Sequence, residues 1–224
     1  MKLSPEWAKA LKYITVYQTI LNKILIHLLP MIKIAIIDYK AGNVRSVYNA
    51  LQRLGVEAAI TANHKEIREA DKVIFPGVGE ASSTMKYLKE QKLDVLIPQL
   101  KQPILGICLG MQLLCKFTEE GNTDCINIFP NKVKLFKGKD KVPHVGWNNI
   151  NNLSGKLFKN ISENPYTYFV HSFYVEKQND TIATCNYMGN FSAAIQKDNF
   201  YAVQFHPEKS GDVGQQILKN FIEL

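Results

Sequence analysis

The sequence predicts an α/β protein whose open, mixed and mainly parallel sheet is flanked by helices and has an antiparallel portion in its C-terminal half. Three observations support this fold class. Short apolar segments alternate with amphipathic helical segments over residues 32–118, as in a parallel sheet. Residues 132–205 contain short strand-like runs separated by turns, which favours antiparallel strands. A sharp strand-to-helix turn is also predicted at Cys108.

The first half begins with a nearly uninterrupted apolar strand over residues 32–39, as expected for a sheet covered on both faces. Asn43 is a suitable N-cap for a helix over residues 44–54, and Gly55 suits the position after its end. Further strands are predicted at residues 57–61, 72–75 and 104–107, and further helices at 64–70, 81–89, 93–100 and 109–117.

The second half changes to shorter strands joined by turns. Lys197-Asp198-Asn199 is a plausible hairpin turn, and residues 211–224 form a closing helix. Strands are predicted at residues 132–136, 167–170, 182–186, 192–196 and 201–205.

No linker or internal repeat divides the chain, so residues 31–224 are predicted to form one domain. Residues 1–30 are interpreted as an N-terminal extension that is either helical or a mis-assigned start. Its apolar residues recur at helical spacing, but polar residues interrupt them and make a poor membrane span. We therefore expect no association with a membrane.

Composition excludes several functional classes. Of the net charge of +7, residues 1–30 carry +3, and the remainder has no arginine-rich run, so no nucleic-acid partner is expected. The four cysteines show no C-x-x-C spacing, which argues against a zinc site, and no other metal or cofactor is indicated. Free thiols without a recognisable signal peptide favour the cytoplasm.

The motif Gly106-x-Cys108-x-Gly110 has the spacing of a nucleophile elbow with cysteine in place of serine. The turn strains the nucleophile, and side chains two residues away on either side would collide. A helix that starts at Leu109 directs its positive N-terminal end at the sulfur, which favours the thiolate. The alternative is a buried structural cysteine between two chance glycines.

Two further segments lie where parallel strands end, at the edge where reactive groups gather in open α/β sheets. Pro76-Gly77-Val78-Gly79 follows a strand, and its Val78 amide with that of Leu109 would make an oxyanion hole. A plain turn is the alternative for this loop.

The second segment contains His206, Pro207 and Glu208, which fit a base and the acceptor that orients it. His144 and His171 have no carboxylate nearby in sequence. Each could line a pocket or pack as a structural histidine.

These motifs together resemble the class I, triad-type glutamine amidotransferases. The resemblance rests on GICLGMQ at residues 106–112, FHPE at 205–208 and PGVG at 76–79, and it extends over residues 31–224. Within that family the sequence is most similar to glutaminase subunits of imidazole glycerol phosphate synthase, in histidine biosynthesis. The residues that carry this similarity are IDY at 37–39, GN at 42–43, RSV at 45–47, CLGMQLL at 108–114, VPHVGWN at 142–148, HSFY at 171–174 and HPEKSG at 206–211.

The resemblance implies a role for each matched residue. Cys108 would attack the carboxamide of glutamine, His206 would transfer protons and Glu208 would orient His206. The backbone amides of Val78 and Leu109 would hold the oxyanion. The reaction would need no cofactor. Gly79, Gln112, Ser172 and Phe173 would contact the glutamine substrate, and Asn43, Trp147 and Lys209 would face a (β/α)8-barrel cyclase in a heterodimer that receives the ammonia.

Two departures and two alternatives accompany this interpretation. The segments Lys40-Ala41 and 121–131 differ from the sequence that is usual in these subunits, but neither touches the predicted triad.

One alternative is a paralogue that feeds ammonia to another synthase, such as a sugar-aminating enzyme. The other is a non-catalytic interaction subunit. Gly77 and Gly79 would also permit a peptide flip at Val78, so we hypothesise a resting state in which that amide is misdirected.

Overall fold

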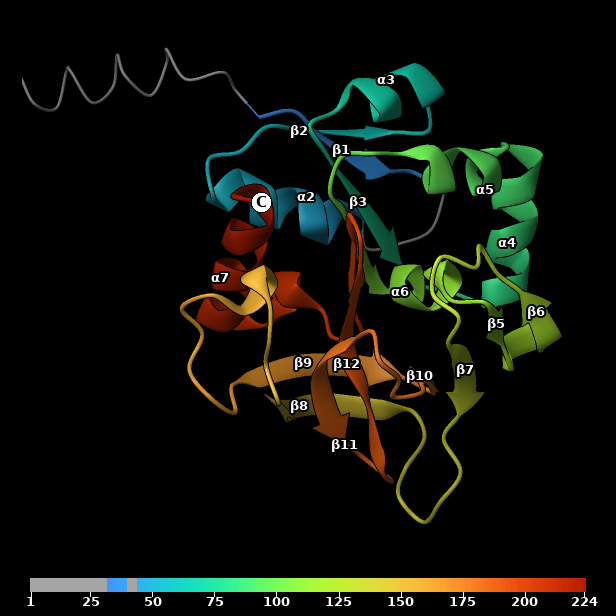
Figure 1. Cartoon of the computed structure of the whole chain (residues 1–224), viewed down its shortest axis with the longest axis vertical. Helices are drawn as coiled ribbons and strands as arrows, with labels where there is room; N and C mark the ends of the chain where they lie inside the picture. Colours follow the sequence, from blue (N-terminus) through green and yellow to red (C-terminus); the bar gives the residue numbers. More distant parts are fainter. Residues whose placement is uncertain (1–31, 40–43) are drawn as a thin grey trace, which may run out of the picture. The chain divides into compact units, whose positions relative to one another are not determined.

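The computed structural model describes residues 32–39 and 44–224. The predicted extension over residues 1–30 and the proposed cap Asn43 lie outside these residues. The described chain forms a nine-stranded mixed sheet and a smaller four-stranded sheet (Figure 1). The large sheet runs in the spatial order β2 (Ala58–Thr61), β1 (Ile34–Ile37), β3 (Lys72–Gly77), β4 (Ile104–Cys108), β13 (Phe200–Val203), β12 (Asn190–Lys197), β11 (Thr181–Asn186), β8 (His144–Asn151) and β9 (Tyr166–His171).

The large sheet has a parallel half and an antiparallel half. The neighbours from β2 to β13 pair in parallel, and those from β13 to β9 pair antiparallel. The predicted fold class is therefore confirmed, with one correction. β13 was expected among the antiparallel strands, but it pairs in parallel with β4 and antiparallel with β12, so it joins the two halves.

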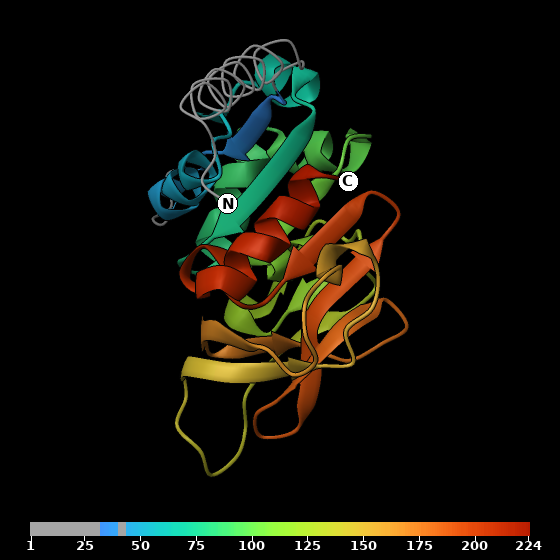
Figure 2. The ribbon, with the colours of Figure 1, turned by 90° about the vertical axis from the view of Figure 1, so that its left-hand side faces the viewer.

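Helices cover both faces of the parallel strands, which explains their continuous apolar sequences. In β1, Ile34 and Ile36 pack with α2 (Val44–Arg53) and α7 (Gly211–Ile222), whereas Ala35 and Ile37 face the opposite layer. Figure 2 shows α7, coloured red, in front of the parallel strands. The opposite layer consists of α3 (His64–Glu69), α4 (Ala81–Glu90), α5 (Leu93–Leu96) and α6 (Leu109–Leu114).

Two predicted helices are shorter than expected. The helix predicted over residues 93–100 is α5 followed by a 3₁₀ turn, η1 (Ile97–Gln99). The helix predicted over residues 109–117 ends at Leu114, because the chain then enters the smaller sheet as β5 (Phe117–Thr118). That sheet has the order β10 (Phe173–Val175), β7 (Lys132–Leu135), β5 and β6 (Thr123–Asp124).

The long strand β8 was not predicted, because glycine and three asparagines are poor strand formers. It forms through pairing with β9 over six residue pairs and with β11. Tertiary pairing thus overrides local propensity in the part of the sheet that carries His144 and Trp147. Among the described residues, no helix is both long enough and apolar enough to cross a membrane.

α6 contacts β3 at a distance that only glycine allows. A side chain at Gly110 would overlap the Phe75 carbonyl oxygen, and one at Gly106 in β4 would lie 3.1 Å from the backbone atoms Gly110 C and Met111 N of α6. The two glycines of the elbow motif are therefore required by close contact between the helix and the sheet.

The variant Gly110→Ala should lose at least about 2 kcal/mol of unfolding free energy, because rigid backbone blocks the added methyl group. Urea denaturation measures this loss. Gly138→Ala is the matched control, since its methyl group would meet only the end of the flexible, displaceable Met188 side chain. Its effect should stay within about 0.5 kcal/mol. Equal stability of the two variants would contradict the close contact.

Candidate active site

Cys108 lies at the junction of β4 and α6 in a strained backbone conformation. Its φ of 52° and ψ of −109° lie in a region that non-glycine residues rarely adopt. The residue is 6% exposed, and its sulfur lies 3.9 Å from the Val170 carbonyl oxygen and 3.7 Å from Gln204 Nε2. This geometry is that of the predicted elbow.

The register of the parallel strands brings the three predicted segments to one edge of the sheet. Gly77, at the end of β3, pairs with Cys108 at the end of β4. On the other side of β4, β13 ends at Val203, shortly before His206. The Pro76–Gly79 loop, the elbow and the histidine segment are therefore neighbours, as the sequence predicts.

His206 and Glu208 form a buried pair. Their Nδ1 and Oε1 atoms are 2.8 Å apart, and the two side chains are 1% and 0% exposed. They flank Pro207 in the 3₁₀ turn η4 (Pro207–Lys209). Cys108 is another side chain that interacts with the His206 ring. The imidazole thus interacts with both a carboxylate and the Cys108 side chain.

Backbone contacts fix this turn. The His206 N–H donates to the Tyr168 carbonyl at 2.9 Å, and Ser210 Oγ donates to the His206 carbonyl at 2.6 Å. The Tyr168 N–H donates in turn to Ser210 Oγ at 3.0 Å. β9 therefore anchors the histidine from the antiparallel half of the sheet.

Burial lowers the pKa of His206, but hydrogen bonds and charge interactions with Cys108 and Glu208 outweigh it and raise the pKa. The site therefore favours an imidazolium beside the sulfur. A protonated imidazole beside a cysteine side chain can serve as the general acid of a covalent reaction.

Cys108 lines a pocket of about 310 Å³ between the elbow, the Pro76–Gly79 loop and β10. The pocket brings together every predicted oxyanion and substrate-contact residue. Its lining residues are Val78, Gly79, Cys108, Leu109, Gln112, Glu120, Pro143, Val170, His171, Ser172 and Phe173.

Tyr39 lies beside the loop that carries the Val78 amide. Burial raises the pKa of the Tyr39 hydroxyl above its usual range, nearby Cys108 raises it further, and the Val78 backbone amide lowers it. The Tyr39 hydroxyl also lies 2.8 Å from where a side chain on Gly77 would begin. Tyr39 thus contacts the loop that carries the predicted oxyanion donor.

Sequence reasoning missed two residues of the site. Glu120 is the only carboxylate among the pocket's lining residues, and its Oε2 accepts the Ala81 N–H at 2.9 Å. Burial raises its pKa. Gln204, which is fully buried, contacts the sulfur. Glu120 had no sequence signal, whereas the position of Gln204 two residues before His206 could have revealed it.

Two of the three predicted partner-facing residues meet at Tyr168. The Trp147 ring lies 6.0 Å from the Tyr168 ring, and Lys209 Nζ lies 5.9 Å from its centroid. Trp147 is 55% exposed. Asn43, the third, lies outside the described residues.

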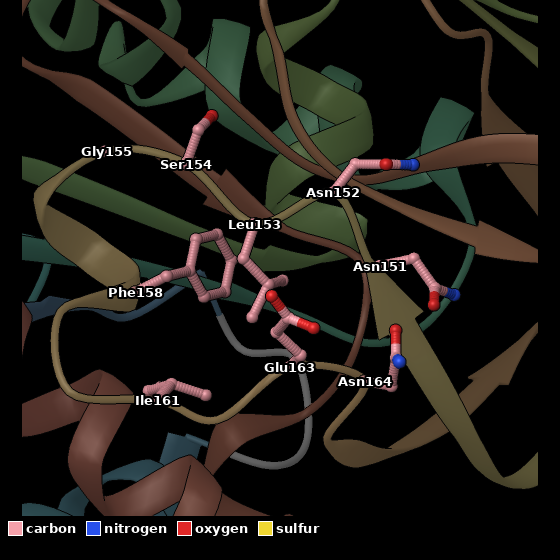
Figure 3. Close-up of a pocket in the computed structure, with 9 residues that line it drawn as sticks. All are labelled: Asn151, Asn152, Leu153, Ser154, Gly155, Phe158, Ile161, Glu163 and Asn164. Atoms are coloured by element: carbon pink, nitrogen blue, oxygen red, sulfur yellow. The ribbon is translucent and has the colours of Figure 1, made fainter.

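A larger hollow of about 530 Å³ lies on another part of the molecule, and its polar lining is mostly asparagine (Figure 3). It contains no cysteine or histidine, and its only carboxylate is Glu163. The smaller pocket, which contains Cys108 and His171, is therefore the candidate active site. Over residues 32–39 and 44–224, no group of three or more histidine, cysteine, aspartate or glutamate side chains is placed to hold a metal ion.

The family model for class I glutamine amidotransferases matches residues 35–224. The chain belongs to this family. Two curated relatives share the name imidazole glycerol phosphate synthase subunit HisH. The one from Bacteroides fragilis is 57% identical over 195 residues, covering 86% of this chain and 100% of the relative. The one from Vibrio parahaemolyticus is 44% identical over 200 residues, covering 86% and 98%.

Solved structures support the same fold at low sequence identity. PurLQS from Thermotoga maritima has a TM-score of 0.67 and 15% identity, covering 87% of this chain and 99% of that one. A glutamine amidotransferase from the same organism has a TM-score of 0.60 and 18% identity, covering 87% and 82%. The class I amidotransferase fold is thus shared with proteins of distant sequence.

In this amidotransferase, Cys108→Ala should lower the pKa of His206, because one of the two groups that raise it is removed. An NMR titration of the imidazole measures the change, with Cys125→Ala as the control outside the pocket. An unchanged pKa of His206 in Cys108→Ala would contradict the coupling.

The raised pKa of His206 also makes the stability of the protein depend on pH. The folded-state pKa of about 10 lies above the value of about 6.5 for an unfolded histidine. The stability that His206 contributes is thus complete below the unfolded pKa and is lost as pH rises through the folded pKa.

Proposed function

We propose that this chain is the glutaminase subunit of an imidazole glycerol phosphate synthase and that Cys108, His206 and Glu208 are its catalytic triad. The observation that carries the proposal is the strained Cys108, which opens into a pocket lined by all six predicted oxyanion and substrate residues. The extensive identity with HisH relatives supports this choice among amidotransferases.

The first half of the reaction forms a thioester. The Cys108 thiolate attacks the side-chain amide carbon of glutamine, and the backbone N–H groups of Val78 and Leu109 stabilise the oxyanion. His206 then donates its proton to the leaving nitrogen, and the C–N bond breaks to release ammonia. Glu208 holds Nδ1 of the imidazole throughout, so Nε2 faces the reacting atoms.

The second half regenerates the enzyme. Neutral His206 removes a proton from water, and the resulting hydroxide attacks the thioester carbon. The tetrahedral intermediate uses the same two amides, and the C–S bond breaks to release glutamate and the Cys108 thiolate. His206 is then protonated, as at the start of the cycle, so the chain's own residues complete the reaction.

Substrate recognition requires hydrogen-bond acceptors within the pocket. Glutamine carries an α-ammonium group, and Glu120 is the only carboxylate among the lining residues. Gln112 and the Ser172–Phe173 segment line the same space. We assign Glu120 as the residue that binds the α-ammonium, which selects an amino acid over a simple amide.

The ammonia passes to a (β/α)8-barrel cyclase, which uses it to form imidazole glycerol phosphate and an aminoimidazole carboxamide ribotide. Trp147 and Lys209, both beside Tyr168, form the contact area for this partner, together with Asn43. The cyclase also reorients the Val78 amide toward the pocket and thereby activates the subunit. We assign the activity to residues 31–224 and place it in the cytosol, where the cysteines stay reduced.

Cys108→Ala should abolish glutamine hydrolysis while leaving ammonia-dependent turnover of the cyclase intact, because only the nucleophile is lost. Glutamate release and ribotide formation are measured with full-length chain, cyclase and its ribonucleotide substrate. Cys125→Ala, outside the pocket, is the control and should retain both activities.

Persistent glutaminase activity in Cys108→Ala would overturn the assignment of the nucleophile. A wild-type chain that releases ammonia only with a sugar-aminating synthase would instead support the paralogue. A chain without glutaminase activity alongside either partner would support a non-catalytic interaction subunit.

Glu120→Gln should raise KM for glutamine more than about tenfold with a smaller change in kcat, because a charge that binds the ground state is lost. Steady-state kinetics with the cyclase present measure both constants. Glu119→Gln is the matched control, because the Glu119 carboxylate accepts the Leu135 N–H instead of lining the pocket. Similar KM values for the two variants would exclude this role of Glu120.

A further inference from the structure

Two buried histidines face each other behind the pocket. β8 and β9 are neighbouring strands (Figure 1). His144 on β8 and His171 on β9 are register partners, and His144 Nδ1 lies 3.1 Å from His171 Nε2. They are 4% and 6% exposed. Only His171 lines the pocket, so His144 lies one contact further from the substrate.

The partners of these rings determine where the protons lie. His171 Nδ1 is 2.7 Å from the Phe173 carbonyl oxygen, which can only accept, so Nδ1 carries the hydrogen. Burial lowers the pKa of His171 to about 3 and that of His144 to about 4, so both rings are neutral near pH 7. Nε2 of His171 must then accept from Nδ1 of His144.

The same reasoning extends the chain of hydrogen bonds outward. With its hydrogen on Nδ1, His144 offers Nε2 as an acceptor, and Asn148 Nδ2 lies 3.4 Å away. Asn148 is half-buried and directly follows Trp147, one of the proposed partner-facing residues. The hydrogen bonds therefore run in one direction, from β8 to the Phe173 carbonyl.

Beyond that carbonyl, the contacts continue to the nucleophile. Gln112 Nε2 donates to the Phe173 oxygen at 2.9 Å and to Gln204 Oε1 at 3.0 Å. Both N–H groups of Gln112 are thus used, and its Oε1 is the polar atom left for a ligand in the pocket. Gln204 Nε2 in turn contacts the Cys108 sulfur at 3.7 Å.

We propose that His144 and His171 are positioning residues that form a relay with hydrogens fixed on Nδ1. The relay holds the Phe173 carbonyl, so Gln112 presents its side-chain oxygen to the α-ammonium group of glutamine. Because it begins beside Trp147, it also connects the partner-facing strand with the substrate pocket. This inference rests on the proposed function, since it assigns part of the glutamine subsite.

A purely structural role for His144 would depend on its ring and not on its nitrogens. The ring stacks on Tyr187, with centroids 4.0 Å apart and planes at 14°, and on Phe169, at 4.9 Å and 23°. Phenylalanine can replace these ring contacts but supplies no N–H group. Asparagine lacks the ring, but its amide can place an N–H near the position of Nδ1. The two substitutions therefore separate the two roles.

With the cyclase present, His144→Phe should raise KM for glutamine about tenfold, because His171 Nε2 loses its donor, while kcat changes less. His144→Asn should keep KM within about threefold of the wild type, because a donor remains. The opposite order, with Phe near wild type and Asn impaired, would show a structural role and overturn the relay. Equal KM values for both variants and the wild type would also overturn it.

NMR of the unmodified chain tests the relay without a variant. At pH 7, long-range ¹H–¹⁵N spectra should show two neutral imidazoles with the hydrogen on Nδ1. His64, whose Nε2 lies 2.8 Å from the Gln91 carbonyl, should carry it on Nε2 and serves as the internal reference. A hydrogen on Nε2 of His144 or His171 would overturn the relay. A wild type without glutaminase activity would instead overturn the proposed function, because the NMR result does not depend on turnover.

Discussion

The close contact between α6 and β3 is the constraint on which the site depends. Gly110 lets the helix approach the Phe75 carbonyl until no side chain fits between them. The chain must therefore turn abruptly at Cys108, and the positive φ of this residue is the result. The strain is tolerated because apolar side chains hold β4 and α6 from both sides of the sheet. A looser contact would relax the turn and withdraw the sulfur from the pocket.

The charge arrangement of the site follows from burial combined with pairing. A lone histidine at the position of His206 would lose its charge, because burial disfavours the imidazolium. Glu208 and Cys108 reverse that preference by contacting the ring on its two sides. His171 lies nearby without a carboxylate, and its pKa falls instead. Two histidines of one site thus take opposite protonation states because their neighbours differ.

The pocket is assembled from two sheets, and this explains how recognition is linked to chemistry. The large sheet supplies Cys108, His206 and the Pro76–Gly79 loop, whereas the smaller sheet brings Phe173 and the segment with Glu120 against them. Gln112 joins the two, because it lies on α6 and donates to the carbonyl of Phe173 in β10. A ligand in this pocket would therefore contact elements of both sheets.

The sequence by itself determined the parallel half of the fold and the chemical groups of the site. Apolar strands, glycine spacing and the Cys108 and His206 motifs are local patterns, and local sterics and chain direction determine what they form. Tertiary structure decided the rest. β8 forms although its asparagines disfavour a strand, because β9 and β11 supply its hydrogen bonds. Glu120, His171 and Gln204 enter the site through contacts between residues distant in sequence, and burial, which no local pattern encodes, sets their protonation and hydrogen bonding.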